Sequence, residues 1–143
     1  MPKGATFDNQ FLKLIFNATA IANMADNAAS SPYTNLYLAL HTADPTSAGN
    51  QTSSEATYTN YTRVAVVRTS GGWTVSTNTV SNAALVQFPQ CGITGNTVTY
   101  VSIGTATSGA GELLYSGALS ASLAVANLIQ PQFAIGQLVA TES

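Results

Sequence analysis

The sharpest hydrophobic pattern in the sequence lies at residues 36–41, where leucine alternates with other residues. Side chains of a β-strand point alternately to its two faces, so the three leucines share one face and the residues between them, His41 included, share the other. The strand should end at Asp44 and Pro45, because proline has no N–H for a ladder and aspartate readily forms turns. This run predicts a β-strand followed by a turn.

Apolar residues recur every three or four positions between residues 7 and 27, which is the spacing of an amphipathic helix. Thr6 is a candidate cap, and Asp8 in the first turn would favour the positive end of the helix dipole. Leu12 and Phe16 make the apolar stripe wider than one contact requires. We therefore expect the helix either to close one end of a β core or to dock on a neighbouring subunit.

A candidate interface combines apolar residues of this helix with the single tryptophan of the chain. Its members are Phe7, Phe11, Leu12, Ile15, Phe16 and Trp73. Large aromatic side chains are common at interfaces, and they are equally common in cores. The sequence leaves these two roles open.

The rest of the chain alternates short strand-like segments with turn signals. Predicted strands lie at 61–69, 73–77, 84–88, 97–103, 112–117 and, in shorter pieces, 118–140. The pair 97–103 and 112–117 predicts a hairpin, residues 46–58 a long surface loop, and residues 77–82 a turn-rich connection with Val80 pointing inward. This pattern predicts a mainly β fold, an antiparallel β-sandwich or jelly-roll-like domain with one N-terminal α-helix; a closed small barrel is the alternative.

A chain of 143 residues is long enough to bury a core without disulfides, and we expect one domain over residues 1–143. A helical arm at residues 1–30 would precede a β-sandwich at residues 33–143. The apolar stretch near the N-terminus is interrupted by polar residues and is too short for a signal sequence or a membrane span. No membrane partner is therefore expected.

Charged residues make up 7% of the chain, whereas soluble domains usually carry about 25%. Hydroxyl and amide side chains replace them, which suits a protein packed against copies or neighbours and predicts a homo-oligomer. A monomer with a hydroxyl-rich surface is the alternative. The net charge is −2 and only four residues are Lys or Arg, so there is no basic stripe for nucleic acid.

The chain offers few groups for metal or cofactor chemistry. His41 is the only histidine and Cys91 the only cysteine, so neither a histidine cluster nor a cysteine-based metal site can form. Gly104, Gly109 and Gly111 do not have the spacing of a phosphate-binding loop. We expect no metal and no cofactor.

No catalytic arrangement stands out either. His41 lies three residues from Asp44 and serines are plentiful, but no G-x-S-x-G element supports a Ser-His-Asp triad. We expect His41 to be a hydrogen-bonded surface or edge histidine, Arg63 to form a structural ion pair with Glu55 or Glu112, and the protein not to be an enzyme.

In order along the chain, these elements resemble a family of small virion proteins of tailed bacteriophages, whose members are often labelled tail fibre proteins. The matching features are the N-terminal helix, the strand and turn LYLALHTADP, the Tyr-x-Arg-Val segment at 61–64, the hairpin from 98–103 to 113–117, and the Phe-Ala-x-Gly close at 133–136. The resemblance covers nearly the whole chain. It implies a non-enzymatic structural protein of the virion, assembled in the cytoplasm of the bacterial host.

The location in the virion is a separate hypothesis. A receptor-binding fibre normally needs repeats or a coiled-coil shaft, and neither is visible, so the compact chain predicts a capsid decoration or cement protein bound to the major capsid protein or other virion proteins. Residues 46–58 and the helix would make the contacts. A minor tail or tail-fibre protein is the alternative, and a carbohydrate-binding module using Trp73 and tyrosines is a third hypothesis.

Overall fold

The computed structural model describes residues 5–21 and 33–143, and the chain forms two compact units. The first unit comprises residues 1–35, 67–86 and 133–143, and the second comprises residues 36–66 and 87–132. The chain therefore passes between the two units four times. Each unit contains a sheet of its own.

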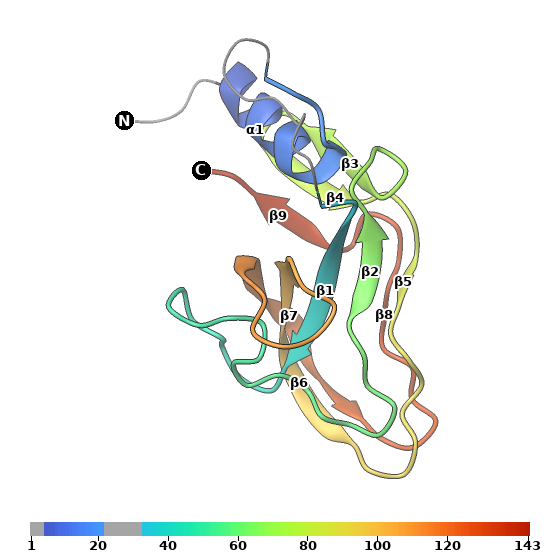
Figure 1. The fold of residues 1–143 in the computed structure, drawn as a ribbon. Coiled ribbons are helices and arrows are strands. Elements are labelled where there is room, and N and C mark those ends of the chain that lie inside the picture. The colour runs from blue at the N-terminus through green and yellow to red at the C-terminus, as the bar shows by residue number, and fades with distance from the viewer. Residues whose placement is uncertain (1–4, 22–32) are drawn as a thin grey trace. The chain divides into compact units, whose positions relative to one another are not determined.

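The first unit is a helix packed on a three-stranded sheet with the order β3-β4-β9 (Figure 1). Its elements are α1 (Ala5–Asn17), β3 (Trp73–Ser76), β4 (Thr79–Asn82) and β9 (Val139–Thr141). Leu12 and Phe16 are fully buried, as is Trp73. The rings of Phe16 and Trp73 meet edge to face with centroids 4.7 Å apart, so this pair holds α1 to β3.

The helix α1 ends at Asn17, whereas the periodicity predicted a helix to residue 27. Ala18 adopts a left-handed backbone conformation with φ of 52°, and such a residue commonly ends an α-helix. The N–H of Thr19 then donates to the carbonyl of Lys13 over 3.1 Å. Residues 22–27 of the predicted helix lie outside the described residues.

Each end of α1 has a charged side chain nearby whose sign is opposite to that of the helix dipole at that end. Asp8 lies in the first turn, as predicted, while Thr6, the predicted cap, lies inside the helix. At the other end the guanidinium of Arg68 donates to the carbonyls of Leu14 and Ile15. A cation at these last carbonyls stabilises the negative end of the helix.

The connection predicted at residues 77–82 is in fact a tight turn followed by β4. β3 and β4 pair antiparallel from Trp73 opposite Asn82 to Ser76 opposite Thr79, with Thr77 in a left-handed conformation in the turn. The predicted inward position of Val80 is confirmed, since its side chain is 1% exposed. β4 is short and mostly polar, so the sequence pattern did not reveal this strand. Pairing with β3 and β9 stabilises β4 more than the strand propensity of its own residues does.

The second unit contains a four-stranded sheet with the order β2-β1-β6-β7. Its strands span β1 Asn35–His41, β2 Val64–Val67, β6 Asn96–Gly104 and β7 Leu113–Val125. β1 pairs antiparallel with β6, from Tyr37 opposite Gly104 to His41 opposite Tyr100. The predicted strand at 36–41 is confirmed, but both of its faces are buried from Leu38 to His41, whereas the alternation predicted one buried face.

The predicted hairpin between residues 97–103 and 112–117 is confirmed as β6 and β7. β7 then runs on to Val125, where the sequence predicted separate short strands. The register changes along the pair, because Tyr100 lies opposite Ala118 whereas Val98 lies opposite Leu123. Four residues of β7 therefore lie opposite one residue of β6, which makes a large irregularity in the pairing.

Two further short strands, β5 (Val86–Gln87) and β8 (Gln132–Phe133), form a two-stranded sheet at points where the chain passes between the units. The predicted fold class, mainly β with antiparallel sheets and a single N-terminal helix among the described residues, is confirmed. The predicted helical arm at residues 1–30 contains α1, which packs on β3 and β4 within the first unit. The assignment of residues 1–143 to one domain stays a prediction.

Candidate functional site

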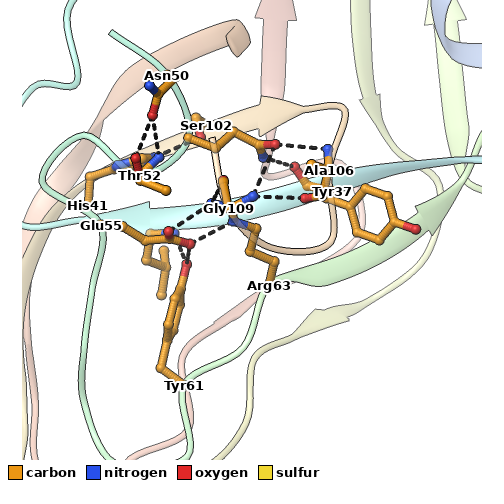
Figure 2. A network of polar contacts seen from close by, with 12 residues as sticks. Tyr37, His41, Asn50, Thr52, Glu55, Tyr61, Arg63, Ser102, Ala106 and Gly109 are labelled. Atoms are coloured by element: carbon orange, nitrogen blue, oxygen red, sulfur yellow. Dashed lines mark hydrogen bonds and ion pairs between the residues drawn. The ribbon is translucent and has the colours of Figure 1, made fainter. Parts of the chain in front are cut away.

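The second unit contains two hydrogen-bonded groups of buried and partly buried polar side chains, one formed by His41 and Ser102 and the other centred on Arg63, which we together call the polar network (Figure 2). Its members are His41, Gln51, Glu55, Tyr61, Arg63 and Ser102. They come from the end of β1, from the segment 42–63 that follows it, and from β6. Four of its members, His41, Glu55, Tyr61 and Arg63, are titratable.

The segment 42–63 folds back along β1 after the turn that the sequence predicted. The N–H of Thr46 donates to Oδ1 of Asp44 over 2.8 Å, which is the turn-forming role expected of this aspartate. Further on, the N–H of Ala56 donates to the carbonyl of Leu40 over 2.8 Å. The returning chain thereby covers the end of β1.

His41 is fully buried and both of its ring nitrogens are hydrogen-bonded. Nδ1 lies 2.8 Å from the carbonyl oxygen of Ser53, and Nε2 lies 2.7 Å from Oγ of Ser102. A carbonyl oxygen only accepts, so we assign the proton to Nδ1, and the Ser102 hydroxyl donates to Nε2. The sequence predicted a surface or edge histidine, which is wrong because β6 and the returning segment enclose the ring.

The environment of His41 disfavours its charged form. Burial lowers the pKa of His41 below its ordinary value of 6.5, and the charge of Arg63 acts in the same direction. The carbonyl of Ser53 and the carboxylate of Glu55 act in the opposite direction but do not outweigh burial. His41 is therefore neutral at pH 7.

The hydrogen bond between the Ser102 hydroxyl and the His41 imidazole pairs the same two groups as the nucleophile and general base of a Ser-His-Asp triad. The groups around this pair differ from those of a triad. In such a triad a carboxylate orients the second ring nitrogen, whereas here a backbone carbonyl does so. Ser102 is only 1% exposed. Asp44, the carboxylate that the sequence placed nearest, bonds to Thr46 instead. The geometry suits a hydrogen bond that fixes β1 to β6.

Arg63 and Glu55 form a two-pronged ion pair. Nε of Arg63 lies 2.7 Å from Oε1 of Glu55, and its Nη2 lies 2.8 Å from Oε2. The guanidinium also donates to the carbonyls of Ala106 and Gly109 over 2.9 and 2.7 Å. The side chains of Arg63 and Glu55 are 2% and 17% exposed, so these charge-assisted bonds are shielded from water. The prediction of a structural ion pair is confirmed with Glu55 as the partner.

Tyr61 joins this ion pair to β1. Its hydroxyl donates to Oε1 of Glu55 over 3.0 Å and accepts the N–H of Leu40 over 3.0 Å. Burial raises the pKa of Tyr61, and the charge of Glu55 raises it further, so the phenol stays protonated. Its ring stacks on Phe88 at 6.3 Å between centroids and meets Tyr58 edge to face at 5.2 Å.

Gln51 connects the returning segment to two other parts of the unit. Its Nε2 donates to the carbonyl of Tyr37 on β1 over 3.0 Å, and its Oε1 accepts the N–H of Ala106 over 3.0 Å. Gly104 and Gly111 make room for it, because a Cβ at either position would come within 2.2 Å of the Gln51 side chain. No sequence pattern pointed to Gln51, which lies in a segment of small polar residues.

Together these bonds fasten the segment 42–63 and the connection 105–112 to the sheet. Every member of the network has a hydrogen-bond partner, which is the condition under which buried polar groups stabilise a unique structure. The predicted surface loop at 46–58 is accordingly anchored, and Gln51, Ala56 and Tyr58 within it are buried. The polar network therefore holds the backbone of these two connections in place against the sheet.

The described residues show no group of three or more His, Cys, Asp or Glu side chains placed to share a metal ion. No helix among them has the length and apolar character needed to cross a membrane.

The six residues of the predicted interface differ in exposure. Three are fully buried, namely Leu12, Phe16 and Trp73. Two are partly exposed, Phe11 and Ile15, and the side chain of Phe7 lies outside the described residues. The interface stays a prediction, and Phe11 and Ile15 are the members of α1 that offer surface for it.

Fold and site together define a mainly β protein in which polar side chains hold long connections against a sheet. A family model described as podophage GP4 fiber I protein gp80 matches residues 8–141. The match extends from the first turn of α1 to β9 and so includes both units. No curated protein matches the chain.

The chain belongs to this family. It is a structural protein of a bacteriophage virion, and the resemblance found in the order of its sequence elements is confirmed.

Proposed function

We propose that this chain is a tail-fibre or minor tail subunit of the virion rather than a capsid decoration protein. The observation that carries the proposal is the family match over residues 8–141, whose description names a fibre protein. The capsid hypothesis drew on the compact, weakly charged chain and the lack of a shaft-like repeat. A fibre subunit that packs against its neighbours can also be compact and weakly charged. These two features therefore do not favour the capsid over the tail.

We propose further that the role is non-enzymatic and that the partners are other virion proteins and copies of the chain. The burial of His41 and Ser102 supports the first point, because the chain has no other histidine to act as a general base. The low charge of the chain supports the second, since such a surface resists association only weakly.

The burial of Trp73 disfavours the carbohydrate-binding alternative. A sugar-stacking platform must present an aromatic face to solvent, whereas Trp73 is 0% exposed and its ring packs on Phe16. Replacing Trp73 would therefore damage the core of the first unit before it altered any glycan contact.

The experiment that tests the location is a count of copies per particle. Quantitative mass spectrometry of purified virions, referenced to the major capsid protein, should give a small number such as about three, six or twelve, as closed rotational symmetry produces at a tail. Immunogold labelling should place the protein at the tail. A count of hundreds with label over the head would overturn the fibre proposal and restore capsid decoration.

A further inference from the structure

The turn at residues 126–129 holds an exposed leucine in an unfavourable backbone conformation. The N–H of Ile129 donates to the carbonyl of Ala126 over 2.9 Å, which closes a four-residue turn. Its third residue, Leu128, has φ of 69°, whereas Asn127 before it is not in the positive region. This is the pattern of a type II turn, whose third position favours glycine or asparagine. Here the leucine stands at that position and the asparagine stands one residue earlier.

The fold does not bury the side chain of Leu128 in return for this conformation. The side chain is 69% exposed, so packing inside the chain does not account for a leucine at this position. Glycine or asparagine would form the same turn with less strain. Backbone strain of this kind collects at functional sites. An exposed apolar side chain that strains its own turn therefore points to a contact outside the chain.

Two further apolar side chains lie near Leu128 in the second unit. Ile129 follows it and is exposed, and Ile93, which is 90% exposed, lies on the adjoining turn. The N–H of Cys91 donates to the carbonyl of Ile129 over 2.8 Å, and the N–H of Leu128 donates to the carbonyl of Cys91 over 2.9 Å. Both turns lie where β6 begins and β7 ends (Figure 1). We call Ile93, Leu128 and Ile129 the apolar tip.

A set of hydrogen bonds holds the backbone of the apolar tip in place. The side-chain amide of Gln90 donates to the carbonyl of Leu128 over 2.9 Å. The N–H of Thr59 donates to the carbonyl of Thr94 over 2.8 Å, and the carbonyl of Thr59 accepts the N–H of Gly92 over 3.0 Å. A surface that is ordered before it meets its partner loses less conformational entropy on binding.

The residues around the apolar tip define the chemistry of the surface that fits it. The segments 56–61, 89–96 and 125–131 hold no charged residue, and their polar side chains are mainly amides and hydroxyls. An apolar centre with a polar rim is the usual arrangement of a protein–protein interface. Membrane surfaces instead attract clustered Lys and Arg, which these segments lack. The surroundings therefore favour a protein partner without charge at the contact.

We propose that the apolar tip binds an uncharged apolar pocket on a different protein of the virion, with Leu128 as the main anchor. Ile93 and Leu128 protrude from their turns, so the complementary surface is concave, and a second apolar tip does not supply one. The inference rests on the proposed association with other virion proteins. It holds whether the chain lies at the tail or at the head.

The test is a competition between the unmodified chain and Leu128→Asn for places in the virion. Both full chains are supplied in equal soluble amounts during infection, and mass spectrometry of purified particles measures their ratio. The unmodified chain should exceed Leu128→Asn at least about tenfold, because burial of a leucine contributes at least that factor to binding. Ile135→Asn is the matched control, since Ile135 is also 69% exposed but belongs to the first unit. This variant should enter particles in proportion to its supply.

A thermal melt of the same variant distinguishes an anchor from a residue that supports the fold. Asparagine tolerates a positive φ, so Leu128→Asn should melt at a temperature no lower than that of the unmodified protein. A clearly lower melting temperature would show that Leu128 stabilises the chain itself, and the proposal would then be wrong.

Three other results would overturn the proposal. Proportional entry of Leu128→Asn into particles would show that the apolar tip is not needed for binding. A change in the sedimenting mass of isolated Leu128→Asn would show that the tip binds a copy of this chain. Flotation of the unmodified protein, but not of Leu128→Asn, with vesicles of phosphatidylethanolamine and phosphatidylglycerol would show that it binds lipid. The copy count and the label position decide the fibre proposal independently, so the two failures are distinguishable.

Discussion

At the scale of single residues, the polar network shows how few buried groups are needed to order a long connection. Arg63 alone bonds to Glu55 and to two carbonyls of the connection 105–112. Its ion pair was predictable because the sequence holds only six carboxylates. The roles of Gln51 and Ser102 were not predictable, since each needs a partner that only the folded chain brings near.

The buried neutral His41 should make stability depend on pH. Its pKa is lowered in the folded state, so the unfolded chain binds more protons in the acid range, and the free energy of unfolding should fall as pH drops below about 6.5. The decrease should approach at most about 1.4 kcal/mol per pH unit. Urea titrations between about pH 7.5 and 5.5, where most carboxylates stay ionised, measure it.

His41→Gln is the control for this effect, because it removes the only histidine. Its stability should be nearly independent of pH over the same range. An equal slope in both proteins would show that His41 does not cause the effect.

Removal of Arg63 should strongly destabilise the second unit. Arg63→Met leaves the carboxylate of Glu55 and the carbonyls of Ala106 and Gly109 without this donor, and we expect a loss of about 3–5 kcal/mol in the free energy of unfolding. Arg63→Lys keeps the charge but not the two-pronged geometry, so it should lose less. A loss below about 1 kcal/mol in Arg63→Met, as for a surface pair, would contradict this account.

At the scale of elements, glycines in the sheet differ in what surrounds them. Gly104 on β6 lies against the side chain of Gln51 and the carbonyl of Glu112, whereas a Cβ at Gly117 on β7 would meet nothing within 4 Å. In sequence the two glycines look alike. The end of α1 and the strand β4 were likewise not predictable. Neither the left-handed conformation of Ala18 nor the pairing of β4 can be read from the spacing of apolar residues.

The contrast between these glycines gives a matched pair of substitutions. Gly104→Ala should destabilise the protein by about 1–3 kcal/mol, because the new methyl group displaces Gln51 or shifts the strand. Gly117→Ala should change stability by no more than about 0.5 kcal/mol. Thermal melts followed by circular dichroism compare the two, and similar effects would show that Gln51 adapts freely.

At the scale of the whole molecule, the two units are built from interleaved segments of one chain. Four passages of the backbone connect them, and neither unit is a continuous stretch of sequence. This topology could not be derived from the sequence, where the strands appear as one series. Each unit holds the ends of the segments that form the other unit. We therefore expect that unfolding of one unit destabilises the other.

We therefore predict that both units unfold together. Trp73 belongs to the first unit and its fluorescence reports on that unit, while hydrogen exchange of β6 amides reports on the second. In Arg63→Met both signals should move to lower urea concentration by the same amount, although Arg63 lies in the second unit only. A fluorescence midpoint that stays unchanged would show that the units unfold independently.

Residue patterns alone were enough to predict the mainly β class, the strand at 36–41 with its turn, the hairpin of β6 and β7, and the pairing of Arg63 with a glutamate. These features depend on side-chain alternation, turn chemistry and charge, which are local or rest on very few candidate partners. The folded chain was needed to show where α1 ends, that β4 is a strand, and that His41 is enclosed between Ser53 and Ser102. Those outcomes depend on contacts between segments far apart in the chain, and such contacts override local preference because burial and pairing contribute more free energy than propensity does.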